Sequence, residues 1–259
     1  MKGGRAHSRD ECDDTIAQLH EASRRHAAAT HLRRAALELQ GAAAFTAVTQ
    51  ALLELRAPTP VIDLCARAIS EELRHSDIYM ALARAYSDAA LQAPRASSID
   101  IPKYPAAGAD GERLLRVVGM CCVNETMACS FLELCFAGAK APLARRGIQE
   151  ILEDEIRHAR VGWAYLGSSD VGPAERRLVS LWLVPIFRAQ WNHWQEHIAN
   201  LPAIDLVEHG CPFPEAIERA SRESIHALIL PGFARAGVDV SAARQWVDSE
   251  VGRAASERV

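Results

Sequence analysis

Apolar residues recur every three to four positions along most of this chain, which is the spacing of a helix with one buried face. Alanine, leucine, glutamate and arginine dominate these stretches, and the strict alternation typical of β-strands is nearly absent. We therefore predict an all-α protein. Its predicted helices cover residues 15–55 (or 31–55 if the first helix breaks), 61–91, 112–138, 143–166, 174–199, 214–228 and 241–256.

Proline and glycine divide the first four predicted helices into two pairs. Short breaks at residues 57–60 and 139–142 each join two helices through a tight turn. Residues 93–111 contain several prolines and glycines, so they form a long irregular connection between the pairs. Two helical hairpins joined by one long crossover form a four-helix bundle with the crossover between its second and third helices.

The organisation of the chain follows from these elements. Residues 1–14 are polar, and we expect them to form a mobile N-terminal tail, whereas residues 15–170 contain the bundle. No linker or change in composition sets off residues 171–259, so we expect these C-terminal helices to pack on the bundle.

Composition limits the partners and the location of the protein. The chain has 29 basic and 33 acidic residues, which gives no strongly basic surface for nucleic acid. The most apolar stretch, residues 117–136, contains Glu125 and Glu133, which argues against a membrane span. The polar N-terminus lacks the apolar core of a signal peptide, and the seven cysteines lack the spacing of a zinc ribbon. We expect a cytoplasmic protein without a nucleic-acid or membrane partner, and leave a homodimer open.

One short pattern occurs twice. Residues 71–75 read Glu-Glu-Leu-Arg-His, and 83 residues later residues 154–158 read Asp-Glu-Ile-Arg-His. Residues three apart on a helix point the same way, so Glu72 with His75, and Glu155 with His158, can each reach one metal ion. A single copy arises by chance among surface residues. Two copies, each with an arginine before the histidine, favour a paired metal site over two surface coincidences.

A paired site in a bundle also needs one glutamate from each of the other two helices. In the third helix the candidate is Glu125, because a charge in so apolar a segment is costly unless paired or metal-bound. Glu125 lies 30 residues before Glu155, and the residue midway between them falls inside the predicted turn. In an antiparallel hairpin the two carboxylates therefore lie at the same height. In the first helix the candidate is Glu38, although its midpoint with Glu72 falls slightly before the turn. The alternative for both is a solvated helix glutamate, and the rival ligands are Glu54 and Glu133.

The order Glu38, Glu72-x-x-His75, Glu125 and Glu155-x-x-His158 resembles the ligand set of the ferritin-like carboxylate di-iron superfamily. The arginine before each histidine is similar to the motifs of acyl carrier protein desaturases and bacterial multicomponent monooxygenases. Residues 38–75 are also similar to little-characterised bacterial ferritin-like proteins. The resemblance covers roughly residues 30–168 and implies a ferritin-like four-helix bundle, here with a C-terminal helical extension.

The resemblance also implies a shell of charged residues around the ligands. Asp154 would accept a hydrogen bond from His75, and Glu71 would accept one from His158. Arg74 and Arg157 would then pair with these acids. The alternative is that Asp154 and Glu71 are ordinary surface acids.

The expected chemistry follows from the ligand set. Four carboxylates and two imidazoles without a thiolate suit two iron ions, with manganese or a mixed manganese and iron pair as alternatives. We expect a non-haem di-iron oxidoreductase, an oxidase or oxygenase that uses dioxygen on a small organic substrate without an amino-acid nucleophile. Electrons for an oxygenase would come from a separate ferredoxin or reductase. The alternatives are a ferroxidase that handles iron and a non-catalytic helical interaction module.

Cys129 marks a departure from the monooxygenase pattern. In monooxygenases of this superfamily a threonine commonly follows the third-helix ligand by one turn, and Cys129 stands at that position here. We predict that Cys129, with Thr126 and Cys122, shapes the substrate cavity without binding metal; the alternative is a core cysteine. A second histidine pair, His193 and His197, is better interpreted as part of an interfacial aromatic face than as a metal site.

Overall fold

The structure, a computed structural model, describes residues 13–95, 101–201 and 203–251. Within these residues it contains helices and one isolated β-bridge, between Leu206 and Cys211, but no β-strand. The prediction of an all-α protein is confirmed. The helices of the bundle are α1 (Asp14–Ala17), α2 (Glu21–Glu54), α3 (Thr59–Ala85), α4 (Gly108–Val117), α5 (Glu125–Gly138) and α6 (Pro142–Leu166).

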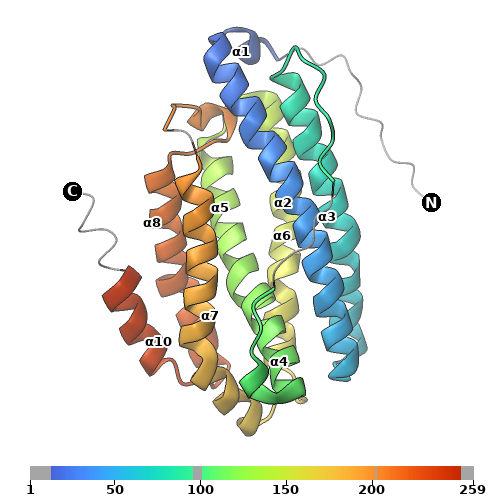
Figure 1. The fold of residues 1–259 in the computed structure, drawn as a ribbon, viewed down its shortest axis with the longest axis vertical. Helices are drawn as coiled ribbons and strands as arrows, with labels where there is room; N and C mark the ends of the chain where they lie inside the picture. The colour runs from blue at the N-terminus through green and yellow to red at the C-terminus, as the bar shows by residue number, and fades with distance from the viewer. Residues whose placement is uncertain (1–12, 96–100, 202, 252–259) are drawn as a thin grey trace.

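Two helical hairpins pack against each other to form the bundle (Figure 1). The helices α2 and α3 make the most extensive contact in the molecule, and α5 packs on α6. The two hairpins meet mainly through α3 and α6. Prolines begin α3 and α6 within their first turn, where the missing N–H has no helical partner. The connection between the hairpins runs from Tyr86 to Tyr104, and its residues 96–100 lie outside the described part of the chain.

The third helix of the bundle is longer than predicted and changes its winding in the middle. A 3₁₀ turn, η1 (Pro105–Ala107), leads into α4, and a π-helical segment, η2 (Val118–Asn124), joins α4 to α5. Short π-helical segments inside α-helices are often found at functional sites. Here the segment ends immediately before Glu125, the acid predicted to bind metal.

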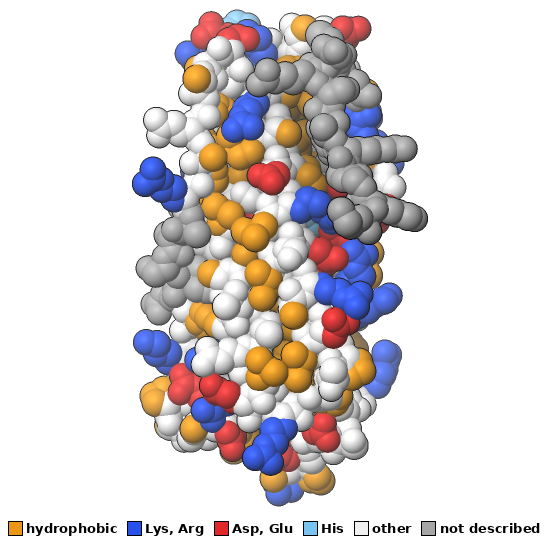
Figure 2. Space-filling model, turned by 90° about the vertical axis from the view of Figure 1, so that its right-hand side faces the viewer, with side chains coloured by type: hydrophobic (Ala, Val, Ile, Leu, Met, Phe, Trp, Pro, Cys, Tyr) orange, Lys and Arg blue, Asp and Glu red, His pale blue; other side chains and the backbone are white. Residues whose placement is uncertain are grey.

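The same helix is the only one in the described part of the chain that is long and apolar enough to cross a membrane. In the structure 61% of its most apolar window is buried inside the protein, as in the core helix of a soluble protein. On the face of the molecule that Figure 2 shows, acidic and basic side chains are intermixed rather than gathered into a patch of one sign.

The C-terminal helices cover the side of the bundle next to α5, opposite α2 and α3 (Figure 1). The first of them, α7, contacts α4 and η2, and α8 contacts α5 and α7. Their side chains join those of the bundle in one large apolar core. The elements are α7 (Pro173–Ala199), η3 (Val207–His209), α8 (Pro214–Ser224), η4 (Ile225–Ile229), α9 (Leu230–Arg235), α10 (Ser241–Trp246) and η5 (Val247–Val251).

Several predicted boundaries differ from the structure. The first helix breaks after Ala17 and restarts at Glu21, and the second ends at Ala85 instead of residue 91, just before a turn in which Ser87 accepts a hydrogen bond from the Ala89 N–H. Asp13, placed in the predicted tail, caps α1 and accepts a hydrogen bond from the backbone N–H of Leu143. Residues 1–12 of that tail, and residues 252–256 of the last predicted helix, lie outside the described residues.

Candidate metal centre

All four long helices of the bundle contribute acidic or histidine side chains to one cluster. The cluster consists of two groups, in each of which the potential ligand atoms lie within 4.8 Å of one another. The first group contains Glu38 from α2, Glu72 and His75 from α3, and Glu155 from α6; the second contains Glu72, Glu125 from α5, Glu155 and His158. Because Glu72 and Glu155 belong to both groups, each of these carboxylates can bridge two ions.

Burial separates the clustered acids from their rivals. The side chain of Glu38 is 16% exposed, and the other members of the cluster are buried. By contrast, Glu54 and Glu133 are exposed and belong to neither group. The carboxylate of Glu54 pairs instead with the guanidinium of Arg113. Neither rival is therefore placed to bind metal with the Glu-x-x-His pairs.

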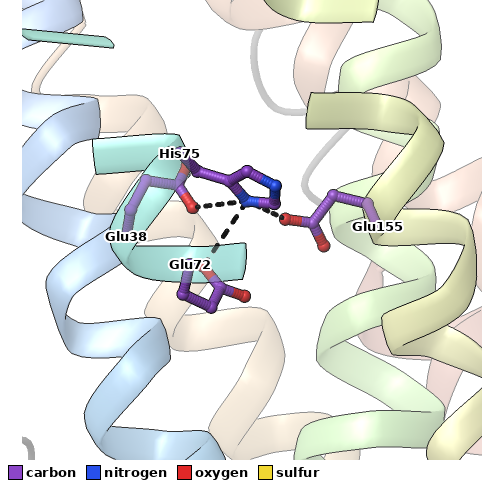
Figure 3. Close-up of side chains that lie close together, drawn as sticks. All are labelled: Glu38, Glu72, His75 and Glu155. Atoms are coloured by element: carbon purple, nitrogen blue, oxygen red, sulfur yellow. Dashed lines mark ion pairs between the residues drawn. The ribbon is translucent and has the colours of Figure 1, made fainter. Parts of the chain in front are cut away.

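Both imidazoles turn the same nitrogen, Nδ1, toward the carboxylates. His75 Nδ1 lies 3.6 Å from Glu38, 3.8 Å from Glu72 and 3.4 Å from Glu155 (Figure 3). His158 Nδ1 lies 3.2 Å from Glu72 and 3.4 Å from Glu155. Neither Nδ1 has a hydrogen-bond partner within the described residues, although both are buried. Buried nitrogens without a partner are costly, and two metal ions, one bound in each group, would satisfy both.

The opposite nitrogen of each imidazole contacts an acid outside the cluster. His75 Nε2 lies 3.0 Å from Asp154 Oδ2, and His158 Nε2 lies 2.9 Å from Glu71 Oε2. These are the two pairings that the resemblance implies. A histidine that donates its Nε2–H to a carboxylate keeps the lone pair of Nδ1 free for a metal.

Two arginines complete the outer shell. Arg74 and Arg157 both pair with Asp154, and Arg157 Nη2 also donates to Glu71 over 3.0 Å. The two arginines therefore link the acids that orient the histidines of both helices. Their positive charges also offset the acids on this side of the cluster.

Crowding of charge changes the protonation of the cluster. Burial by itself lowers the pKa of a histidine, but the carboxylates of Glu155, Glu38 and Glu72 outweigh burial and raise the pKa of His75 to about 11. At His158 the carboxylates of Glu155, Glu71 and Glu72 likewise outweigh burial and raise the pKa. Burial and neighbouring carboxylates raise the pKa of Glu125 well above its ordinary value. The cluster therefore holds protons that metal ions would displace.

A glycine makes room for one bridging acid. A Cβ at Gly41 would lie only 2.7 Å from Glu72 Oε2, closer than atoms normally approach. In the structure the space at Gly41 is taken by Glu72, one of the two acids shared by both groups.

A cavity of about 620 Å³ adjoins the cluster. The acids Glu38, Glu72, Glu125 and Glu155 lie on its wall. The rest of the wall combines polar and charged side chains, among them Arg34, Gln190 and Glu196, with apolar and aromatic ones, which include Leu37, Ala44, Met120, Phe131, Leu132 and Trp194. A small molecule in this cavity would lie directly against the candidate metal ligands.

The residues predicted to shape this cavity lie elsewhere. Cys129, Thr126 and Cys122 do not line it, and the wall one turn after Glu125 is formed by Ala128. The Thr126 hydroxyl accepts a hydrogen bond from Trp163 Nε1, over 3.1 Å. The sulfur of Cys122 faces Gly162 of α6. Burial and the nearby carboxylates raise the pKa of the Cys129 thiol, so Cys129 lies near the cluster but outside the cavity wall.

The C-terminal extension contributes side chains to the site and to the cavity wall. Trp194 Nε1 donates to Asn124 Oδ1, and the Asn124 amide donates to Glu125 Oε1, each over 3.1 Å. A side chain of α7 thus helps to orient a candidate ligand. His193 and His197 also line the cavity, with their Nε2 atoms 3.1 Å apart. The sequence shows that a polar residue, Asn124, precedes Glu125. It does not show that Trp194 contacts Asn124, because this contact depends on the packing of α7.

Comparison with known proteins gives no family for this chain. No family model, curated protein or solved structure matches it. The geometry of the cluster and the repeated sequence pattern are therefore the observations from which its function can be inferred.

We predict that Glu125→Ala and His158→Ala each lower the bound metal from about two ions per chain to one or fewer, because each removes a ligand of the second group. Helix content should remain close to that of the unaltered protein. Metal analysis and circular dichroism measure the two quantities. The matched control is Glu133→Ala, which alters an exposed acid of the same helix; equal metal content in all three variants would refute the assignment.

Metal binding should also release protons. A histidine with its ordinary pKa is about nine-tenths neutral at pH 7.5, whereas the raised pKa values of His75 and His158 keep both imidazoles charged there. We expect the metal-free protein to release roughly two protons or more when it binds manganese, and its affinity to rise with pH by about tenfold per displaced proton per pH unit. Calorimetry in buffers of different ionisation enthalpy measures the release, with His193→Ala as control. Binding without proton release would contradict this prediction.

Proposed function

We propose that this protein is a non-haem di-iron oxidoreductase of the ferritin-like carboxylate superfamily. In this proposal it is an oxidase or oxygenase that uses dioxygen on a small organic substrate in the cytoplasm. The observation that carries the proposal is the pair of ligand groups that share Glu72 and Glu155 on the wall of a cavity. Manganese, or one manganese with one iron, is compatible with the same ligands.

The donor set supports a pair of redox-active ions. Four carboxylates and two neutral imidazoles balance two divalent cations, and the described residues of the cluster include no thiolate. When bound, two iron ions would supply the electron transfer that the reduction of dioxygen requires. An oxygenase would then need electrons from a separate reductase or ferredoxin.

The protein's own residues would orient the ligands and exclude water. Asp154 and Glu71 hold the imidazoles so that both Nδ1 atoms face the carboxylates. Asn124 holds Glu125 on the other side of the cluster. The apolar part of the cavity wall would limit water beside the reacting atoms when a substrate fills the cavity, which would strengthen the electrostatic interactions there.

The cavity favours an organic substrate over iron oxidation alone. Oxidation of ferrous ions needs a path for ions and water, and a polar lining would suit it best. Part of the lining here is apolar, with Leu37, Phe131 and Trp194, and this part would hold the apolar portion of an organic molecule. We therefore favour the oxidase or oxygenase over a ferroxidase or a non-catalytic interaction module.

The proposal is tested by loading the metal-free protein with two ferrous ions per chain without oxygen and then adding oxygenated buffer. We expect rapid oxygen consumption, measured with an electrode, and repeated consumption when a chemical reductant and mediator are supplied. Glu155→Ala, which removes a shared acid, should abolish it. Glu133→Ala should leave it unchanged.

The other functions predict different outcomes. Without a reductant, a ferroxidase would consume oxygen again with each addition of ferrous ion beyond two per chain, and would release ferric ion. An interaction module would neither retain iron nor consume oxygen faster than free iron does. Either result would overturn the proposed function.

A further inference from the structure

One end of the cavity contains a buried arginine that forms no ion pair with an acid of the described residues. Arg34 is 7% exposed and lines the cavity. Its Nη1 donates to the carbonyl oxygen of Gly210 over 2.9 Å, and its Nη2 lies 3.8 Å from Cys135 Sγ. No carboxylate oxygen of the described residues lies within 4.0 Å of its guanidinium. A guanidinium has five N–H groups and stays charged at all ordinary pH values, so much of its capacity to bind an anion is unused.

A buried unpaired charge is costly, and the rest of the site does not neutralise it. Two divalent cations would offset the four ligand glutamates. In the outer shell Arg74 and Arg157 offset Glu71 and Asp154. Glu38 contributes to the raised pKa of Arg34, but once the cluster holds its metals the charge of that carboxylate would be offset by them, and Arg34 would keep a positive charge without an ion-pair partner. An anion bound in the cavity would neutralise it.

Aromatic rings fix the position of this guanidinium. Its Cζ lies 4.9 Å from the centre of the Phe131 ring and 5.7 Å from that of Tyr79. Both rings line the cavity. They favour the cation through their π-faces but, unlike a carboxylate, they do not accept its N–H groups in the plane of the guanidinium.

Tyr79 supplies a second donor beside Arg34. It is 1% exposed and lines the cavity, and its hydroxyl makes no hydrogen bond to any described residue. A phenol can donate one hydrogen bond. Buried hydroxyls normally have a partner, so this one also has capacity for a ligand in the cavity.

Both residues lie one helical turn from the candidate metal ligands, toward the same end of the bundle. Arg34 comes four residues before Glu38 on α2, and Tyr79 comes four residues after His75 on α3. Because α2 and α3 run in opposite directions, the two steps point the same way, by about 6 Å each. A molecule held at Arg34 and Tyr79 would extend from there past the metal ligands.

We propose that Arg34 and Tyr79 bind the carboxylate of the substrate, which is then a small carboxylic acid with an apolar body. Calling this ligand the substrate rests on the proposed function; the binding site itself does not. The guanidinium would receive the two carboxylate oxygens side by side, and the hydroxyl would donate to one of them. The carbon chain would lie against Leu37, Leu132 and Trp194.

The test compares octanoate with octanamide, which has a similar shape but no charge. Calorimetry on the manganese-loaded protein without oxygen measures both affinities. We expect octanoate to bind about 10- to 100-fold more tightly than octanamide, as for hydrogen bonds to a charged group. Arg34→Gln should abolish this preference and leave octanamide binding unchanged. Tyr79→Phe should weaken octanoate binding by about tenfold.

Arg33→Gln is the matched control, because Arg33 is the neighbouring arginine on the cavity wall but is exposed and bonds to the carbonyl of Asn200. It should change neither affinity by more than about twofold. Unchanged octanamide binding shows that the cavity of a variant is intact. If Arg34→Gln fails to fold, the loss of octanoate affinity in Tyr79→Phe tests the proposal instead. Equal affinities for the two probes would overturn the proposal. A preference that survives Arg34→Gln and Tyr79→Phe would also overturn it, because the metals would then be holding the carboxylate.

The outcome is separate from that of the oxygen experiment. Tight octanoate binding without oxygen consumption would support the carboxylate site and contradict the proposed function. Oxygen consumption without a preference for octanoate would do the reverse.

Discussion

Four carboxylates held inside one helical bundle repel one another, and this repulsion constrains the rest of the structure. Glu72 and Glu155 lie between the two histidines, with Glu38 and Glu125 on either side. Without cations the cluster must retain protons, which is why burial and neighbouring charges raise the pKa values of Glu38 and Glu125. Two divalent ions would replace those protons and turn the repulsion into attraction. Metal binding and stability of the bundle are therefore coupled.

Features outside the cluster support this arrangement. Asp154 and Glu71 fix the orientation of the two imidazoles, and Arg74 and Arg157 form ion pairs that hold these acids in place. Gly41 leaves the space that Glu72 occupies. On the opposite side, Asn124 and α7 hold Glu125. The C-terminal helices therefore help to build the site, in addition to covering the bundle.

Much of the cluster follows from local geometry and could be predicted from the sequence. Helical spacing alone puts His75 beside Glu72 and His158 beside Glu155. Measuring from the turn of the second hairpin then selects Glu125, which lies at the same height as Glu155. The same measurement supports Glu38 less well, yet both acids meet the Glu-x-x-His pairs in the structure. The rivals Glu54 and Glu133 satisfied the sequence pattern less well, and they are exposed.

The cavity could not be predicted in the same way, because its shape depends on packing between helices distant in sequence. Spacing suggested that Cys129 shares the face of Glu125, but Ala128 forms the wall and Thr126 contacts Trp163 of α6. The roles inferred for Arg34 and Tyr79 could not be predicted either, because the sequence does not show which groups contact a buried side chain.

The central claim is that the cluster holds two metal ions through the Nδ1 atoms of His75 and His158. Anomalous X-ray diffraction from crystals loaded with ferrous iron without oxygen tests it most directly. The account predicts two peaks about 3.5–4 Å apart, one beside each Nδ1, with Glu72 and Glu155 between them. No peak in the cluster, or metal bound instead at His193 and His197, would contradict it.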